Sequence, residues 1–150
     1  MKKNWSAIIP AAGKSKRFES KKSKILYKYK KKTIIEHIVD KVKNKVQDIP
    51  EEVPSPTFTL VQTYDTQIGE IWHADLYRLT SHQEAVELGL EEAFETSISL
   101  IEWPDRLGDL SQYSPLNIAF SSGASDSERQ LKLQGPASIW TPRLQGLSDE

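Results

Sequence analysis

One stretch decides the fold, Glu70-Ile-Trp-His-Ala-Asp-Leu-Tyr-Arg-Leu79, because it has the pattern of a strand with an acid in its middle. Strand alternation would make both of its faces largely apolar. That pattern is typical of an interior strand covered on both sides, as in α/β proteins. Burying the carboxylate of Asp75 is costly, so we expect it to find a cation, a metal ion or several hydrogen-bond donors. The two predicted faces are Ile71, His73, Asp75, Tyr77 and Leu79, and Trp72, Ala74, Leu76 and Arg78.

The size of the chain, 150 residues and 17.0 kDa, fits one domain with or without an appendage. The sequence has no cysteine, which excludes a disulfide framework and a thiolate metal site. No apolar run reaches membrane-spanning length, and the lysine-rich start lacks the apolar core of a signal peptide. We therefore expect a cytoplasmic protein that does not contact a membrane.

The charge reverses near residue 47. Residues 1–46 contain fourteen Lys and one Arg against three acidic residues, a net charge of +12, whereas residues 47–150 contain five basic residues against eighteen acids, a net charge of −13. Such asymmetry can mark a basic arm for nucleic acid or for an acidic partner. It also suggests that two coding segments of different origin are joined near Gln47 to Glu51. We predict an N-terminal segment over 1–47 and a second region over 48–150.

The N-terminal segment has the order expected at the start of a nucleotide-binding α/β unit. An apolar strand over Trp5 to Ile9 is followed by the loop Pro10-Ala-Ala-Gly13, whose glycine would let backbone N–H groups approach phosphate. Thr33 is the predicted cap of an amphipathic helix over 34–46. The prolines of 48–56 predict a loop or linker. We expect a Rossmann-like strand, loop and helix.

The second region predicts strands separated by short helices. Ser81 and Glu84 form a capping-box pattern, and Gly89 can end the helix that they start. A further helical turn or two covers Glu91 to Glu95. The fold class is therefore α/β, a mixed sheet with flanking helices, although the pattern leaves open whether the strand at 5–9 joins that sheet. The predicted strands are 58–64, 70–79, 97–103, 116–120 and 129–133, and the tail from Leu144 is expected to fray.

Asp75 and Glu102 lie on neighbouring predicted strands and could converge at one edge of the sheet. In open α/β sheets the ligand crevice lies outside the carboxyl ends of the strands. Two carboxylates there can hold a hydrated Mg²⁺ ion, which takes one or two carboxylates together with water and phosphate oxygens. Alternatively, Glu102 is a surface acid and Asp75 pairs with Arg78 or a lysine. We expect Trp72 and Tyr77 to pack in the core.

Four blocks of the second region resemble the TsaE family in order and spacing, over about residues 52–147. They are Val53-Pro-Ser-Pro-Thr-Phe-Thr-Leu-Val-Gln62, His73-Ala-Asp-Leu-Tyr-Arg-Leu79, Glu87-Leu-Gly89 and Leu100-Ile-Glu-Trp-Pro-Asp-Arg-Leu107. That family is the P-loop ATPase subunit of the bacterial system that makes the threonylcarbamoyl modification on the adenosine beside the tRNA anticodon. The resemblance implies a P-loop-ATPase-like fold, ATP or ADP with Mg²⁺, two partner protein subunits, and tRNA as an indirect partner.

The resemblance also implies roles for individual residues. Thr57 would lie on a switch-like loop facing the γ-phosphate, and Asp75 would act on Mg²⁺ directly or through water. Glu102 would position metal or attacking water, and Trp103 would lie against the nucleotide. His73 belongs to the same block, but its residue type alone favours a satisfied interior histidine.

The phosphate loop of that family departs from its pattern in this chain. The family carries Gly-x-x-x-x-Gly-Lys-Thr between a strand and a helix, where backbone N–H groups and the lysine hold the phosphates. The nearest match is Gly13-Lys14-Ser15, and Ile8 stands where the first glycine would be. Gly13 also precedes Ser55 by more residues than the family's separation. We therefore predict impaired nucleotide hydrolysis.

The first 46 residues resemble the start of a nucleotidyltransferase that acts on sugar phosphates or related alcohol phosphates. The resemblance implies that Gly13 lies in a loop around the nucleoside triphosphate and that Arg17 and Lys24 neutralise its phosphates. Ser23 stands where proline is usual, and the likeness stops before the metal-binding Asp of that family. Two alternative functions follow, a nucleoside-triphosphate-binding fragment and a docking module without catalysis. The matching blocks are Ala7-Ile-Ile-Pro-Ala-Ala-Gly-Lys-Ser-Lys-Arg-Phe18, Ser23-Lys-Ile-Leu26 and Thr33-Ile-Ile-Glu-His-Ile-Val39.

Overall fold

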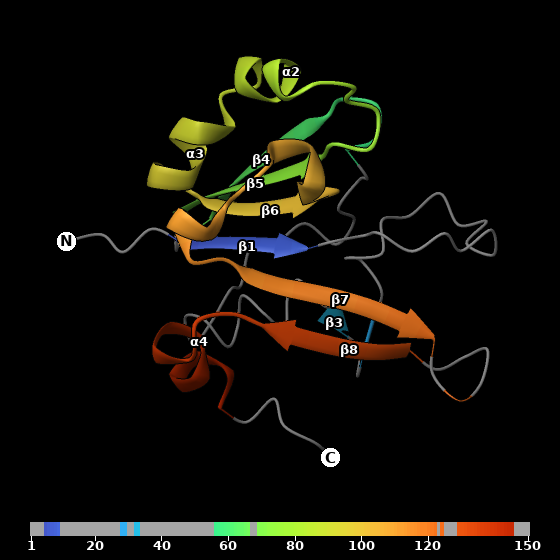
Figure 1. The fold of residues 1–150 in the computed structure, drawn as a ribbon, viewed down its shortest axis with the longest axis vertical. Coiled ribbons are helices and arrows are strands. Elements are labelled where there is room, and N and C mark those ends of the chain that lie inside the picture. Colours follow the sequence, from blue (N-terminus) through green and yellow to red (C-terminus); the bar gives the residue numbers. More distant parts are fainter. Residues whose placement is uncertain are drawn as a thin grey trace.

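The computed structural model describes residues 5–9, 28–29, 32–33, 56–66, 69–122, 124 and 129–145, with side-chain surroundings from residue 56 onward. Its main feature is a six-stranded sheet in the order β4-β5-β6-β1-β7-β8 (Figure 1). The strands are β1 (Trp5–Ile9), β4 (Val61–Thr66), β5 (Gly69–Asp75), β6 (Ile98–Glu102), β7 (Leu116–Ser122) and β8 (Arg129–Gln134). A second, two-stranded sheet contains β2 (Lys28–Tyr29) and β3 (Lys32–Thr33). The helices are α2 (His82–Glu87), α3 (Leu90–Thr96) and α4 (Ala137–Leu144), with 3₁₀ turns η2 (Pro104–Leu107) and η3 (Ser111–Tyr113).

The large sheet is mixed, which confirms the predicted α/β class. Strands β5, β6, β1 and β7 run parallel to one another, while β4 and β8 pair antiparallel at the two edges. The N-terminal strand β1 lies between β6 and β7, so it joins the same sheet. Strand β5 is flanked by β4 and β6 and has no exposed edge. The Rossmann-like character of the first segment and the division at residue 47 stay predictions.

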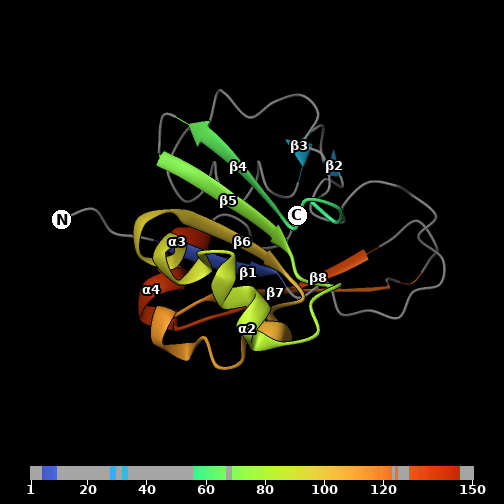
Figure 2. The ribbon, with the colours of Figure 1, turned by 90° about the horizontal axis from the view of Figure 1, so that it is seen from above.

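Helices α2 and α3 cover one face of the sheet. Figure 2 shows both helices on the same side of β5 and β6. Ala74, Leu76 and Ile101 are fully buried on this face, and they pack with Leu90 and Phe94 of α3. Burying a large apolar side chain contributes about 1.5–3 kcal/mol, so this cluster stabilises the packing of the helices on the sheet. Its other buried members are Leu79, Ala85 and Leu107.

The helix boundaries follow the predicted caps. The Ser81 hydroxyl accepts the N–H of Glu84 at 3.4 Å and donates to the Glu84 carboxylate at 3.0 Å. Gly89 has a φ of 74°, which ends α2 and begins α3 in one residue. A left-handed conformation is accessible to glycine at little cost. The capping-box and glycine predictions are therefore confirmed.

Two predicted strand boundaries are wrong for local reasons. Strand β5 ends at Asp75 and does not continue to Leu79, because the Asp75 carboxylate accepts the backbone N–H of Tyr77 at 3.1 Å and turns the chain. Strand β4 begins at Val61 and not at 58, because Leu60 has a φ of 66° and its N–H bonds to Pro56 O at 2.6 Å. Asp75 is thus the last residue of its strand.

Helix α4 is an element that sequence patterns did not predict. Its first turn is followed by Pro142, and the buried Trp140 is its anchor, with its indole N–H donating to Ser114 O at 2.9 Å. Gly135 makes room for this indole, since a Cβ there would lie 2.5 Å from Trp140 Cδ1. The predicted helix at 34–46, most of the linker and residues 146–150 lie outside the described residues.

Candidate functional site

The carboxyl edge of the parallel strands brings three strand ends into one row. In the sheet register, Glu102 pairs with Asp75 on one side and with Ile9 on the other, and each is the last residue of its strand. Residues in register on adjacent strands lie on the same face of the sheet. The predicted convergence of Asp75 and Glu102 is therefore confirmed, at the position where open α/β sheets bind ligands.

Asp75 is buried and is satisfied by neutral donors. The residue is only 6% exposed. The Thr57 hydroxyl donates to Oδ2 at 2.6 Å, and the Tyr77 N–H donates to Oδ1. Arg78 instead donates to Phe58 O at 2.7 Å. The alternative in which Asp75 pairs with Arg78 is wrong. The structure brings Thr57 to Asp75, whereas the position of Thr57 facing a γ-phosphate stays a prediction.

Glu102 is also an interior acid, 5% exposed, and not a surface residue at a strand end. Its Oε1 lies 3.0 Å from Nε2 of His73, which is fully buried. The backbone N–H of Leu76 donates to Glu102 O at 3.1 Å, so the chain leaving β5 is held against the end of β6. The interior position expected for His73 is confirmed, but only one of its ring nitrogens is satisfied, because Nδ1 has no hydrogen-bond partner.

Aromatic side chains flank this edge. Trp103 follows Glu102 with a φ of 61°, and its ring centroid lies 5.0 Å from that of Tyr77. Tyr77 is 56% exposed, so its predicted core position is wrong, because the turn at Asp75 carries it out of the strand. Trp72 is partly buried against the helix-side cluster, as predicted. Phe58, with 87% of its surface exposed, lies under the Arg78 guanidinium at 5.8 Å.

The donor set at the row fits a hydrated magnesium ion. Asp75, Glu102 and Thr57 offer hard oxygen ligands, and Mg²⁺ commonly takes one or two carboxylates while keeping several waters. Within the described residues there is no group of three or more His, Asp or Glu side chains able to hold a metal.

The predicted phosphate-binding residues Gly13, Lys14, Ser15, Arg17 and Lys24 lie outside the described residues. The structure does place the strand that precedes them. Ile8 pairs with Ile101 and Asn117 inside the sheet, and Ile9 ends β1 beside Glu102.

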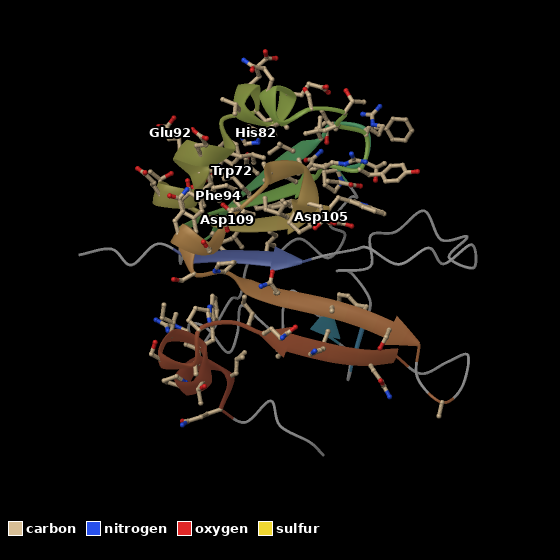
Figure 3. The ribbon with its side chains drawn as sticks, in the orientation of Figure 1. Trp72, His82, Glu92, Phe94, Asp105 and Asp109 are labelled. Carbon is tan, nitrogen blue, oxygen red and sulfur yellow. The ribbon has the colours of Figure 1, made fainter. Side chains whose placement is uncertain are left out.

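A groove on the helix-covered face is the feature that sequence reasoning missed. It lies among α2, α3, η2 and η3 with a volume of about 370 Å³. Figure 3 labels three residues that line it, His82, Phe94 and Asp109. Because the sheet separates this face from His73 and the Asp75 and Glu102 side chains, the groove is not part of the carboxylate site. Its apolar lining comes from Ala85, Val86, Leu90, Phe94, Leu107 and Leu110.

Comparisons with known proteins agree on one family. The family model described as "Threonylcarbamoyl adenosine biosynthesis protein TsaE" matches residues 30–131. A Rickettsia bellii protein named "tRNA threonylcarbamoyladenosine biosynthesis protein TsaE" is 57% identical over 51 residues, covering 34% of this chain and 35% of that protein. Proteins of the same name from Rickettsia conorii and Bacillus subtilis are 43% identical over 77 residues and 32% identical over 80 residues. These matches cover 51% and 53% of this chain, and 43% and 49% of those proteins.

The chain thus spans about a third to a half of the length of the curated relatives it matches. The matched range begins at residue 30, upstream of the predicted boundary at 47. The matches give no support to the nucleotidyltransferase resemblance of the first 46 residues. In the described part of the chain, no helix combines the length and the apolar character needed to cross a bilayer.

Proposed function

Because the chain belongs to the TsaE family, we propose that it is a nucleotide-binding subunit that supports the biosynthesis of threonylcarbamoyladenosine in tRNA, with impaired nucleotide hydrolysis. The observation that carries the proposal is the row of Asp75 and Glu102, two buried carboxylates at the ends of adjacent parallel strands. The ligands would be ATP or ADP with Mg²⁺, the partners the two other protein subunits of the modification complex, with tRNA contacted indirectly, and the compartment the cytoplasm.

Each residue at this edge of the sheet has a distinct role in the proposal. Asp75 and Glu102 would hold the metal ion, directly or through water. When bound, Mg²⁺ would neutralise the negative charge on the phosphate oxygens. Thr57 keeps Oδ2 of Asp75 in a fixed direction, and Glu102 would orient a water toward the phosphate. Trp103, supported by the Tyr77 ring, would cover one side of the nucleotide.

The phosphate contacts would come from Gly13, Lys14, Ser15 and Arg17. Gly13 is four residues beyond Ile9, so the chain can extend at most roughly 14 Å from the row before reaching it. This reach is compatible with a loop that meets phosphate at the same edge. The first glycine of the family pattern is replaced by Ile8, which pairs within the sheet. Since phosphate contacts dominate catalysis in P-loop proteins, we expect weak binding and little turnover.

Calorimetric titration with Mg-ADP tests the proposal. We expect binding weaker than micromolar that is lost in Asp75→Asn and reduced in Lys14→Ala. Lys132→Ala, on the edge strand β8, is the control and should leave the affinity unchanged. Micromolar binding that Lys14→Ala abolishes would refute the impaired phosphate loop. No heat of binding at any accessible concentration would refute nucleotide binding itself.

A docking module without catalysis is a second candidate, and the groove favours it. Helices α2 and α3 carry exposed acids, of which Glu91 lines the partly apolar groove, and no Lys or Arg lies between Arg78 and Arg106. Such a surface suits a protein segment with an apolar anchor and basic flanks. Co-purification with the two partner subunits that is lost in Val86→Asp, without any nucleotide turnover, would favour this candidate. The exposed acids are Glu87, Glu91, Glu92 and Glu95.

A further inference from the structure

We infer that His73 is a positioning residue that fixes the direction of the Glu102 carboxylate for the metal-nucleotide site. This inference rests on the proposed function. It concerns a residue whose type alone suggested only interior packing. The observation behind it is the hydrogen bond between Nε2 of His73 and Oε1 of Glu102 at 3.0 Å, with His73 fully buried and Glu102 5% exposed.

Sheet register explains why these two side chains meet. His73 pairs with Leu100, and Asp75 pairs with Glu102, so His73 and Glu102 are diagonal neighbours on one face of β5 and β6. Diagonal neighbours on adjacent strands are within reach of long side chains. His73 therefore approaches Glu102 from the amino-terminal side of the row, beneath the edge where a ligand would bind.

The two carboxylates of the row have separate donors. Asp75 takes its hydrogen bonds from Thr57 and from the Tyr77 backbone, and Oε1 of Glu102 is bonded to His73. Two acids in register on adjacent strands repel each other when both are charged. A bond that draws Oε1 toward His73 gives Glu102 a defined orientation despite this repulsion. Fixing a rotatable side chain before the ligand arrives lowers the entropy cost of binding.

The unsatisfied nitrogen of the ring argues against packing as the sole role. A carboxylate only accepts, so a hydrogen bond to it requires a proton on Nε2 of His73, and the inference expects the tautomer in which Nδ1 carries none. Nδ1 is buried without a partner in the structure. Burying a polar atom without a hydrogen bond is unfavourable. A side chain selected only for packing would not carry this cost, whereas a donor aimed at Glu102 requires Nε2–H.

Metal-dependent nucleotide affinity separates positioning from packing. Titrations of ADP are performed with excess Mg²⁺ and again with EDTA, on the unaltered chain, His73→Leu and His73→Gln. Loss of a residue that orients a ligand of a metal costs roughly 10–100-fold in metal affinity. We expect a fall of at least about tenfold for His73→Leu with Mg²⁺ and no change in EDTA. The Gln side chain can donate to Glu102 and should restore most of the affinity.

Leu100→Val is the matched control, because Leu100 is the register partner of His73, is buried, and makes no side-chain bond to Glu102. It should lower stability without a magnesium-specific loss. Should His73→Leu fail to fold, the comparison of His73→Gln with the unaltered chain remains, together with nitrogen-15 NMR of the His73 ring. The proton is expected on Nε2, and a proton on Nδ1 would overturn the inference.

The outcomes distinguish the inference from the function on which it rests. Equal losses with and without Mg²⁺ in His73→Leu, or no rescue by His73→Gln, would overturn the inference and leave the proposed function intact. Absence of ADP binding by the unaltered chain would overturn both.

Discussion

Replacing Thr57 by valine removes one hydroxyl and keeps the shape of the side chain. In the structure this hydroxyl donates to Oδ2 of Asp75 at 2.6 Å, and Asp75 is 6% exposed. A hydrogen bond to a charged group contributes roughly 1.5–3 kcal/mol. We therefore expect Thr57→Val to lower the free energy of unfolding by about 2 kcal/mol. For a chain of this size the melting temperature should fall by about 4–8 °C.

Urea denaturation of five proteins measures this effect: the unaltered chain, Thr57→Val, Thr63→Val, Asp75→Asn and the double variant of Thr57→Val with Asp75→Asn. The exposed Thr63 on β4 provides the control, since Thr63→Val should change stability by less than about 0.5 kcal/mol. In an Asp75→Asn background the acceptor is neutral, so Thr57→Val should cost only about 1 kcal/mol. A loss no larger than that of Thr63→Val, or an equal loss in both backgrounds, would refute the dependence of Asp75 on Thr57.

Three further predictions concern the fold. Gly135→Ala should destabilise by about 1–3 kcal/mol, since its Cβ would lie 2.5 Å from Trp140 Cδ1; an unchanged urea midpoint would contradict this. At Gly89 an added Cβ has space, but the backbone φ is 74°. We therefore expect Gly89→Ala to lower stability by about 1 kcal/mol through backbone strain alone, as measured by thermal denaturation, with the fluorescence of Trp140 unchanged. Hydrogen bonds from Thr80, then Ser81, lower the pKa of Glu84 below its ordinary value of 4.5, so its contribution is present above that pH and lost as pH falls through the lowered pKa. Glu84→Gln should therefore be less stable than the unaltered chain at pH 7, with a gap that closes in acid; a gap independent of pH would disprove the assignment.

Local patterns in the sequence were enough to predict several elements correctly. The Ser81 cap and Gly89 bracket α2 because both act within one turn of chain. Strand β6 was predictable because its apolar run is short and Pro104 stops it. Asp75 and Glu102 could be predicted as a pair because parallel strands end at the same edge. Only the structure shows toward which side of that edge each carboxylate points.

Other features depended on groups that are distant in sequence. The end of β5 at Asp75 depends on a side-chain bond to the Tyr77 backbone, which strand periodicity does not register. Helix α4 is held by Trp140 bonding to Ser114, a contact across the end of the sheet. Trp140 would be difficult to place from its own neighbourhood, since Pro142 interrupts the helical pattern.

The sequence by itself determined the class of the fold, the family blocks and the acids that could meet a metal ion, because periodicity, caps and motifs are properties of neighbouring residues. Only the tertiary structure decided that β1 lies between β6 and β7, and that His73 holds Glu102. Both depend on strand pairing between segments far apart in the chain, whose register is set by burial on both faces of the sheet at once. That pairing places the end of β1 beside Glu102, and with it the point from which the predicted phosphate loop departs.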